Sequence, residues 1–370
     1  MLDLILGRQD LTAARAALLA SARKGDSSVV HEVEAAVAAN PSKAIAFDAA
    51  GFATVTGAGR TWAGGRFEVV MVGALLRRVK GLARSGPRRR PRLSVVSGVD
   101  ALTDIGALQA TDDGDTVFQV ASQFNCLEAP GPHLTSVASY FTDPTQGPRA
   151  SISAFPGTLV RHYAAPGRNG ERFVQTDASQ LDLLEHVCPP SVAKVKGGYL
   201  ASQNIHDPRA FAAALEANFE QVQVGVHEGV EAVLGFDWDG LVTPPASRHL
   251  AQVFTSTFAG GGYSASGDLD GMKDVICGHL LRAAYMGTLL AAASLGKRRV
   301  LLTLIGGGVF SNPHRLIWQA ILSALTEFEA VAPEAIDVVV NAREGIGAAH
   351  DEVLARIENS GGVFCELGKA

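Results

Sequence analysis

The chain has 370 residues, of which 47% are hydrophobic and only 6% aromatic, so its core must be built largely from aliphatic side chains. This length and composition predict a globular α/β protein of one large or two ordinary domains, and exclude a disordered or fibrous chain. The net charge of −5 argues against general nucleic-acid affinity, because neutralising phosphates requires an excess of lysine and arginine.

Cysteine use and the distribution of apolar residues bear on the compartment. Four cysteines lie far apart, without a CxxC pair or a Cys/His cluster, so we expect neither disulfides nor a structural zinc site. The first residues lack the pattern of a signal peptide, and no apolar run reaches the roughly 20 residues of a membrane span. We therefore expect a cytoplasmic protein with no metal, no cofactor, no nucleic-acid partner and no membrane partner.

The N-terminal part of the chain predicts a helix followed by short strands. Residues 9–39 are alanine-rich with helical spacing, and Asn40-Pro41 predicts the end of this helix. Strand-like pieces (KAIAFD, FATVTG and RTWAGGRFEVVMV) precede a helix-like stretch, GALLRRVKGLA. The basic segment 85–92 is typical of a solvated loop, with a phosphate or partner contact as the alternative. We treat residues 1–92 as an N-terminal extension and 93–370 as the main domain.

From Leu93 onward, strand-like and helix-like segments alternate. Strands are expected at RLSVVSG, TVFQVAS, ASISAF, TLVRHY, QVQVGV, EAVLGF and AQVFTSTF, before a long helix over residues 271–295. VLLTLIG is continuously apolar, as is typical of a strand buried on both faces, and an amphipathic helix follows it at Pro313. AIDVVVN is the last expected strand. The alternation predicts a layered α/β sheet.

Three consecutive glycines, Gly306 to Gly308, join the apolar strand to the amphipathic helix. In a mostly parallel sheet, ligands bind where the carboxyl ends of strands meet helix N-termini, and free amides there suit a phosphate. The loop lacks the lysine of a P-loop and the spacing of a dinucleotide fingerprint. The alternative is that the glycines only allow close packing of strand against helix.

Polar residues also follow the strand TVFQVAS, where burial without hydrogen bonds would be costly, so they form either a network or a site. A compact, turn-rich segment, YFTDPTQGPRA, lies downstream. Glutamine and asparagine, which occur in these segments, recognise ribose hydroxyls well because they both donate and accept hydrogen bonds. The residues singled out are Ser122, Gln123, Asn125, Glu128, Asp143, Thr145, Gln146 and Gly147.

RLSVVSGVDALTDIGALQA and DTVFQVASQFN resemble the opening of a macrodomain, and LIGGGVFSN is similar to the loop with which macrodomains hold the diphosphate of ADP-ribose. Four motifs in order resemble a divergent branch of the macrodomains, which includes a bacterial effector able to remove ADP-ribose from arginine. The motifs are ASQFNCLE, DPTQGP, VGVHEGVE and LTLIGGGVFSN. The resemblance covers residues 93–345. It implies a three-layer, macrodomain-like α/β core with a mixed sheet, to which the N-terminal helix and strands are added.

The resemblance also implies positions for ADP-ribose. Asp104 and Ile105 would lie at the adenine, Asn125 at the distal ribose, and Asn341 at the adenine or proximal ribose. The first loop lacks the usual glycine run, and DPTQGP is its expected replacement. The expected ligand-binding residues are Asp104, Ile105, Gln123, Asn125, Thr145, Gln146, Gly147, Gly306, Gly307, Gly308, Val309, Phe310, Asn312 and Asn341.

The activity implied by the resemblance is hydrolysis of ADP-ribose from a modified protein, with arginine as the expected acceptor. An ADP-ribose-binding reader without turnover and a hydrolase of free ADP-ribose derivatives are the alternatives. The expected partners are thus ADP-ribose and an ADP-ribosylated protein.

Cleavage of the bond to arginine develops positive charge at the ribose C1″, which carboxylates can stabilise. Asp268, Asp270 and Asp274 of GDLDGMKD are our first catalytic candidates, although acids at a helix start also simply complement its dipole. Glu228 of VGVHEGVE is the fourth. It shares one face with Glu231 only if the glycine between them marks a bulge.

The two acids of GFDWDG, Asp237 and Asp239, are typical of a turn, with metal ligation as the alternative.

Overall fold

The computed structural model describes residues 23–24, 27–82, 90–235, 240–241, 248–265, 268–343 and 345–367. The acids of GFDWDG, most of the basic segment 85–92, and the first part of the helix expected over 9–39 lie outside the described residues.

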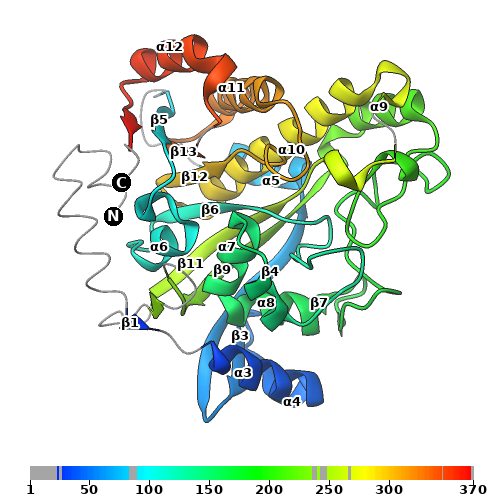
Figure 1. Cartoon of the computed structure of the whole chain (residues 1–370), viewed down its shortest axis with the longest axis vertical. Coiled ribbons are helices and arrows are strands. Elements are labelled where there is room, and N and C mark those ends of the chain that lie inside the picture. Colours follow the sequence, from blue (N-terminus) through cyan, green and yellow to red (C-terminus); the bar gives the residue numbers. More distant parts are fainter. Residues whose placement is uncertain are drawn as a thin grey trace.

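Within the described residues, a ten-stranded sheet forms the middle layer of the molecule (Figure 1). The strands from β14 to β11 are parallel, and β9, β4, β3 and β2 each run antiparallel to the neighbour before them. In spatial order the strands are β14 (Phe364–Glu366), β5 (Arg92–Ser97), β13 (Asp337–Arg343), β12 (Arg299–Thr303), β6 (Thr116–Ala121), β11 (Arg248–Thr255), β9 (Gln223–Ala232), β4 (Arg60–Met71), β3 (Ala53–Gly57) and β2 (Ile45–Phe47). Two short pairs lie apart from it, β1 (Arg23–Lys24) with β10 (Gly240–Leu241), and β7 (Ala165–Pro166) with β8 (Arg172–Phe173).

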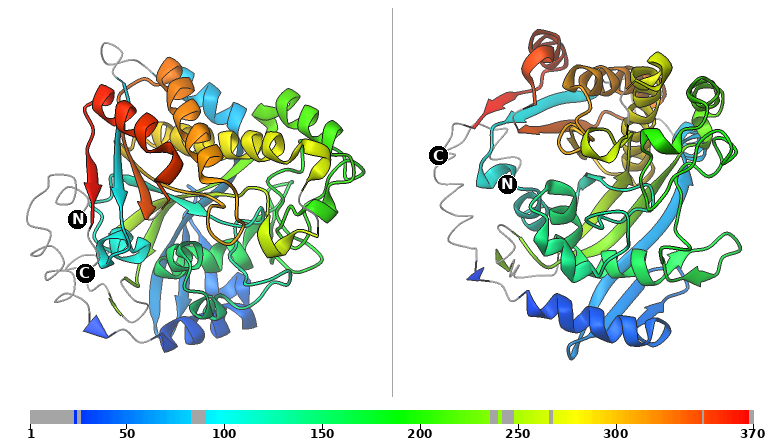
Figure 2. Two further views of the ribbon diagram at one scale, coloured as in Figure 1. Left: turned by 45° about the horizontal axis from the view of Figure 1, so that its top comes forward. Right: turned by 45° about the vertical axis from the view of Figure 1, so that its right-hand side comes forward.

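Helices cover both faces of the sheet and complete three layers, as Figures 1 and 2 show. One layer contains α5 (Val72–Lys80), α9 (Pro208–Ala217), α10 (Lys273–Ser294), α11 (His314–Val331) and α12 (His350–Ser360). The other contains α3 (Ser28–Ala39), α4 (Pro41–Ala44), α6 (Ile105–Ala110), α7 (Gln146–Ser153) and α8 (Phe155–Tyr163). Short 3₁₀ helices include η2 (Val137–Thr142), η5 (Gly261–Tyr263) and η6 (Leu269–Gly271). The expected fold class, a three-layer α/β core with a mixed sheet, is confirmed.

The parallel strands are apolar because they are covered on both faces. Val300, Leu301 and Leu302 of β12 are fully buried, as the continuous apolar run predicted. Among the described helices, α10 is the one long and apolar enough to cross a membrane, and 78% of its most apolar window is buried inside the protein. Its composition therefore serves the core, where it packs between α5, α9 and α11.

Two expected strands, ASISAF and TLVRHY, are wrong: they lie in helices α7 and α8. Buried Ile152, Phe155 and Leu159 recur at intervals of three and four residues, so the helical period outweighs the short alternation. Pro156 is favourable in the first turn of α8 but would weaken a strand. EAVLGF is not a separate strand either, because its first residues continue β9.

The N-terminal extension shares the sheet with the rest of the chain. β4 pairs with β9 from Gly64 opposite Val230 to Met71 opposite Gln223. A second hydrophobic cluster, which includes Val33 of α3 and Phe155 of α8, fills the space beneath this part of the sheet. One sheet thus runs across the boundary predicted before residue 93.

Candidate functional site

A cavity of about 520 Å³ opens at the carboxyl ends of the parallel strands β6, β12 and β13. This is where open α/β sheets bind ligands, because strand ends and helix starts leave backbone groups and loop side chains available there. Eleven expected ligand-binding residues line it: Ile105, Gln123, Thr145, Gln146, Gly147, Gly306, Gly307, Gly308, Val309, Phe310 and Asn341.

Three further expected ligand-binding residues support the walls instead of lining the cavity. Asp104 caps α6 by accepting a hydrogen bond from the backbone of Ala107 at 3.1 Å. Asn125 accepts one from the backbone of Leu127 at 2.9 Å. The amide of Asn312 donates to a backbone carbonyl of the neighbouring loop at 2.9 Å. All three are buried, so their role in the structure is to shape the loops.

The three glycines after β12 have different reasons to be glycine. Gly306 has a φ of +73°, and a Cβ there would lie 2.4 Å from the amide nitrogen of Asn312. A Cβ on Gly307 would lie 2.8 Å from the ring of His314. Packing therefore explains both of these. A Cβ on Gly308 would face open space in the cavity. Of the three glycines, Gly308 is therefore the one whose backbone a ligand can approach closely.

Two carboxyl groups, Glu128 and Asp143, line the cavity from the segments that follow β6. Burial raises the pKa of Glu128 well above its ordinary value, the negative charge of Asp143 raises it further, and Arg161 opposes both. Within the described chain, one carboxyl oxygen of Glu128 is buried without a hydrogen-bond partner. Asp143 instead accepts bonds from the backbone and the hydroxyl of Thr145, at 2.9 and 2.7 Å.

A proton donor and a charge-stabilising carboxylate require unlike environments, and the environments of these two acids are unlike. Desolvation raises the pKa of Glu128 and so favours its neutral form, whereas Asp143 is hydrogen-bonded by its own loop. The carboxyl group of Glu128 also packs against Gly147, where a Cβ would lie 2.8 Å from its Oε2. A side chain at Gly147 would therefore displace the acid.

A fully buried arginine, Arg161, lies behind this wall. Its guanidinium donates to the backbone carbonyl of Cys126 at 3.0 Å and lies 3.7 Å from the ring centre of Phe254. It also contacts Nδ1 of His227 at 3.1 Å. Burial lowers the pKa of His227 well below its ordinary value, and the charge of Arg161 lowers it further, so the imidazole is a neutral acceptor. Burial likewise lowers the pKa of Arg161 to about 10.

Polar atoms without a protein partner surround the cavity. Within the described residues they include the side-chain oxygens of Gln123, Thr303 and Asn341, in addition to that of Glu128. Buried acceptors of this kind are costly unless a ligand or water satisfies them. The arrangement suits a ligand with several hydroxyl and amino groups spread along its length.

Aromatic side chains form a further wall, of which the sequence indicated Phe310 but neither of the two tyrosines. Tyr199 and Tyr263 stack with ring centres 5.0 Å apart, and Phe310 meets Tyr263 edge-on at 5.2 Å. The hydroxyl of Tyr199 accepts a bond from Gln123 at 2.6 Å, which fixes the amide beside Glu128. Tyr199 and Tyr263 come from segments far from the glycine loop in sequence, and only the folded chain brings them together.

The structure does not bring the four expected catalytic acids to the cavity. Asp268, Asp270 and Asp274 are exposed at the start of α10, where Asp268 caps η6 by accepting from a backbone N–H. Glu228 forms an ion pair with Arg66 of β4.

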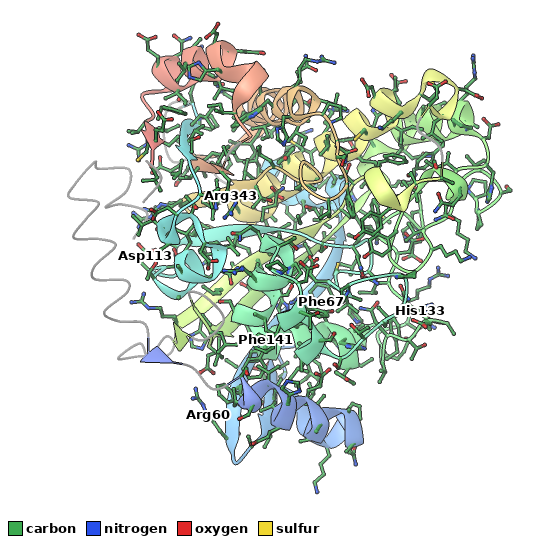
Figure 3. The ribbon with its side chains drawn as sticks, viewed as in Figure 1. Arg60, Phe67, Asp113, His133, Phe141 and Arg343 are labelled. Carbon is green, nitrogen blue, oxygen red and sulfur yellow. The ribbon has the colours of Figure 1, made fainter. Side chains whose placement is uncertain are left out.

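A bulge, the condition for Glu228 and Glu231 to share one face, is present at Gly229, which has a φ of +72° and lies where the register with β11 shifts. Both acids nevertheless pair with arginines of β4, and Glu231 binds Arg60. Figure 3 shows Arg60 near the tip of the β3–β4 hairpin, away from Arg343, which lines the cavity.

The fold and cavity define an α/β protein whose candidate ligand site is a cavity at the carboxyl ends of the parallel strands. No family model matches the sequence, and no curated protein matches it. Among solved structures, it is similar to poly(ADP-ribose) glycohydrolase from Thermomonospora curvata bound to the inhibitor ADP-HPD. The identity is 14% and the TM-score 0.41, over 88% of this chain and 97% of that one. It is also similar to poly(ADP-ribose) glycohydrolase from Deinococcus radiodurans in complex with ADP-ribose, with 12% identity and a TM-score of 0.40, over 80% and 93% of the two chains. Both likenesses are distant.

Proposed function

We propose that this protein binds ADP-ribose and hydrolyses it from a modified protein, with arginine as the acceptor. The observation that carries the proposal is a single cavity that joins a glycine loop, Gly306 to Gly308, to two unlike carboxyl groups, Glu128 and Asp143. The first feature suits a diphosphate, and the second suits cleavage of a glycosidic bond. The motif resemblance to macrodomains supports the same ligand.

The diphosphate would bind between the glycine loop and the start of α11. Pro313 precedes this helix without a side-chain cap, and the first turn carries no acid, so its positive dipole end is uncompensated. The cavity lining also includes Arg343 and His314, whose ring contacts the carbonyl of Gly307 at 3.2 Å. A negatively charged group is therefore favoured here.

Glu128 and Asp143 would act at the distal ribose. The neutral Glu128 donates its proton to the departing arginine nitrogen as the bond from C1″ to that nitrogen breaks. The carboxylate of Asp143 stabilises the positive charge at C1″ and accepts a proton from the water whose oxygen bonds to that carbon. The products are free ADP-ribose and the protein with an unmodified arginine side chain. At the other end, the unpartnered oxygen of Asn341 would accept from the adenine amino group, beside apolar Ile105.

Calorimetric titration with ADP-ribose, with AMP as control, tests the binding step. We expect a dissociation constant on the order of micromolar for ADP-ribose and much weaker binding of AMP. Release of ADP-ribose from an arginine-modified protein then tests the reaction, with poly(ADP-ribose) and O-acetyl-ADP-ribose assayed beside it.

The outcomes separate the alternatives. Binding without release from any substrate would identify a reader. Turnover of O-acetyl-ADP-ribose alone would identify a hydrolase of free derivatives, and release from the polymer alone would replace the acceptor that we propose. No heat with ADP-ribose would overturn the proposal as a whole.

A further inference from the structure

The short helix η2 connects the two acids of the cavity. Tyr140 lies within it, is fully buried, and accepts a hydrogen bond through its hydroxyl from the backbone of Glu128 at 3.1 Å. Asp143 follows directly, and its backbone N–H donates to the carbonyl of Tyr140 at 3.1 Å. The position of η2 therefore sets the position of Asp143 relative to Glu128.

The start of η2 is held by a residue of the N-terminal extension. Glu34 of α3 accepts hydrogen bonds from the backbone N–H groups of Val137 and Ala138, at 2.6 and 2.8 Å. The natural capping position, Ser136, makes no side-chain cap of its own. Glu34 therefore supplies from another element the acceptor that a cap residue normally provides.

Glu34 has little freedom to move. Its side chain is 4% exposed, and its third hydrogen bond comes from the hydroxyl of Tyr163 at 3.0 Å. No described arginine or lysine pairs with it, so backbone and hydroxyl donors alone satisfy this buried carboxylate. Such bonds are stronger than neutral ones because the acceptor is charged.

The helix that carries Glu34 is itself tightly packed. Val30, Val33 and Val37 of α3 are fully buried in the second hydrophobic cluster. A Cβ on Gly57 would lie 3.0 Å from Val33, which shows how closely α3 approaches strand β3. The helix that carries Glu34 is thus anchored in the core beneath the N-terminal extension.

We infer that Glu34 is a positioning residue of the site: by holding the start of η2, it sets Asp143 against Glu128. This inference rests on the proposed hydrolase activity. Through this one side chain the N-terminal extension helps to position Asp143, in addition to forming an edge of the sheet. The residue touches no ligand itself and acts through Val137, Ala138 and Tyr140.

The test compares Glu34→Gln with two matched controls. Glutamine keeps the volume but replaces one acceptor oxygen with an NH₂ group, so one of the donors it faces loses its partner. Val37→Ala on the same helix leaves a cavity in the same cluster but keeps the Glu34 carboxylate and the three groups that donate to it, and Tyr163→Phe removes only the third donor. The readouts are kcat, KM, the melting temperature, and amide exchange of residues 136–143.

Glu34→Gln should lower kcat by about tenfold or more with little change in KM, because misplacement of a reacting group by about 1 Å is enough for such a loss. Exchange over 136–143 should speed up in the same variant. Val37→Ala should lower the melting temperature at least as much, while both controls keep kcat within about twofold of the wild type.

A Glu34→Gln variant with the kcat of Val37→Ala, or with unchanged exchange over 136–143, would overturn the inference. If the wild type itself releases no ADP-ribose, the proposed function fails separately. The exchange comparison then still decides whether Glu34 holds the Asp143 segment.

Discussion

Glu128 is the residue on which the proposed chemistry depends most directly. Glu128→Gln keeps the shape of the side chain and removes the transferable proton, so kcat should fall by about 10²- to 10⁴-fold, the usual contribution of a general acid. The affinity for ADP-ribose should change little. Turnover measured beside calorimetric binding checks both statements.

The matched control for this prediction is Asp268→Asn. Asp268 is one of the three acids that the sequence favoured, and it is exposed outside the cavity, where it caps η6. We expect unchanged turnover in this variant. Loss of activity in Asp268→Asn with retention in Glu128→Gln would return the catalytic assignment to the GDLDGMKD segment.

The raised pKa of Glu128 also has a consequence for stability. Because the folded state binds this proton more tightly than the unfolded chain, the contribution is complete below the ordinary glutamate pKa of 4.5. It is lost as the pH rises through the folded pKa. Glu128→Gln cannot ionise, so its melting temperature should exceed that of the wild type at about pH 8 and approach it near pH 4. Equal pH dependence in the two proteins would contradict a buried, neutral Glu128.

At the level of elements, the glycine loop allows packing to be separated from ligand contact. Gly308→Ala places a methyl group in the open cavity, so ADP-ribose affinity should fall by about tenfold or more at an unchanged melting temperature, since overpacking costs roughly 1–3 kcal/mol. Gly347→Ala is the matched control, because its Cβ also meets open space but lies outside the cavity lining.

Gly306→Ala should behave differently from Gly308→Ala. Its positive φ costs about 1–2 kcal/mol for a residue with a side chain, and the added Cβ meets Asn312, so the protein itself should be destabilised. Thermal unfolding in the absence of ligand measures this. If Gly306→Ala and Gly308→Ala both bind ADP-ribose as the wild type does, the diphosphate does not lie on this loop.

Helices and strands whose apolar residues follow one clear period could be predicted from the sequence. Those whose apolar residues fit both the helical and the strand period could not. β12 and α10 are long and follow a single pattern, so their type and approximate bounds are as expected. α7 and α8 are short, and their apolar residues fit both a strand and a helix. Packing decides between the two, of α7 against β6 and of α8 against β4 and β9. α12 and β14 were not anticipated, because AIDVVVN was the last expected element.

The same limit applies to the cavity. The glycine loop and Gln123 could be predicted as cavity residues because they follow predicted strands, and the end of a strand is visible in the local sequence. That Glu128 and Asp143 line the same cavity could not be predicted from the sequence, although both had been noted as loop residues. It depends on η2 turning back so that Tyr140 reaches Glu128, which is a tertiary contact.

At the scale of the whole molecule, the sheet argues against treating the N-terminal extension as an addition to a finished core. β4 pairs with β9 from Gln223 to Val230, and its side chains enter the same hydrophobic cluster as the parallel strands. Phe67 and Val70 of β4, with Leu75 and Val79 of α5, are at most 5% exposed. Their removal would expose an apolar surface and an unpaired strand edge together.

We therefore expect that residues 93–370 alone do not fold into a stable domain, whereas the chain from residue 23 onward, which keeps every described element, does. Thermal unfolding followed by circular dichroism should show a cooperative transition for the longer chain and none, or aggregation, for the shorter one. A cooperative transition and full ADP-ribose release by residues 93–370 would show that the main domain is independent. That result would also remove Glu34 from the site, because the shorter chain lacks it while η2 would still hold Asp143 in place.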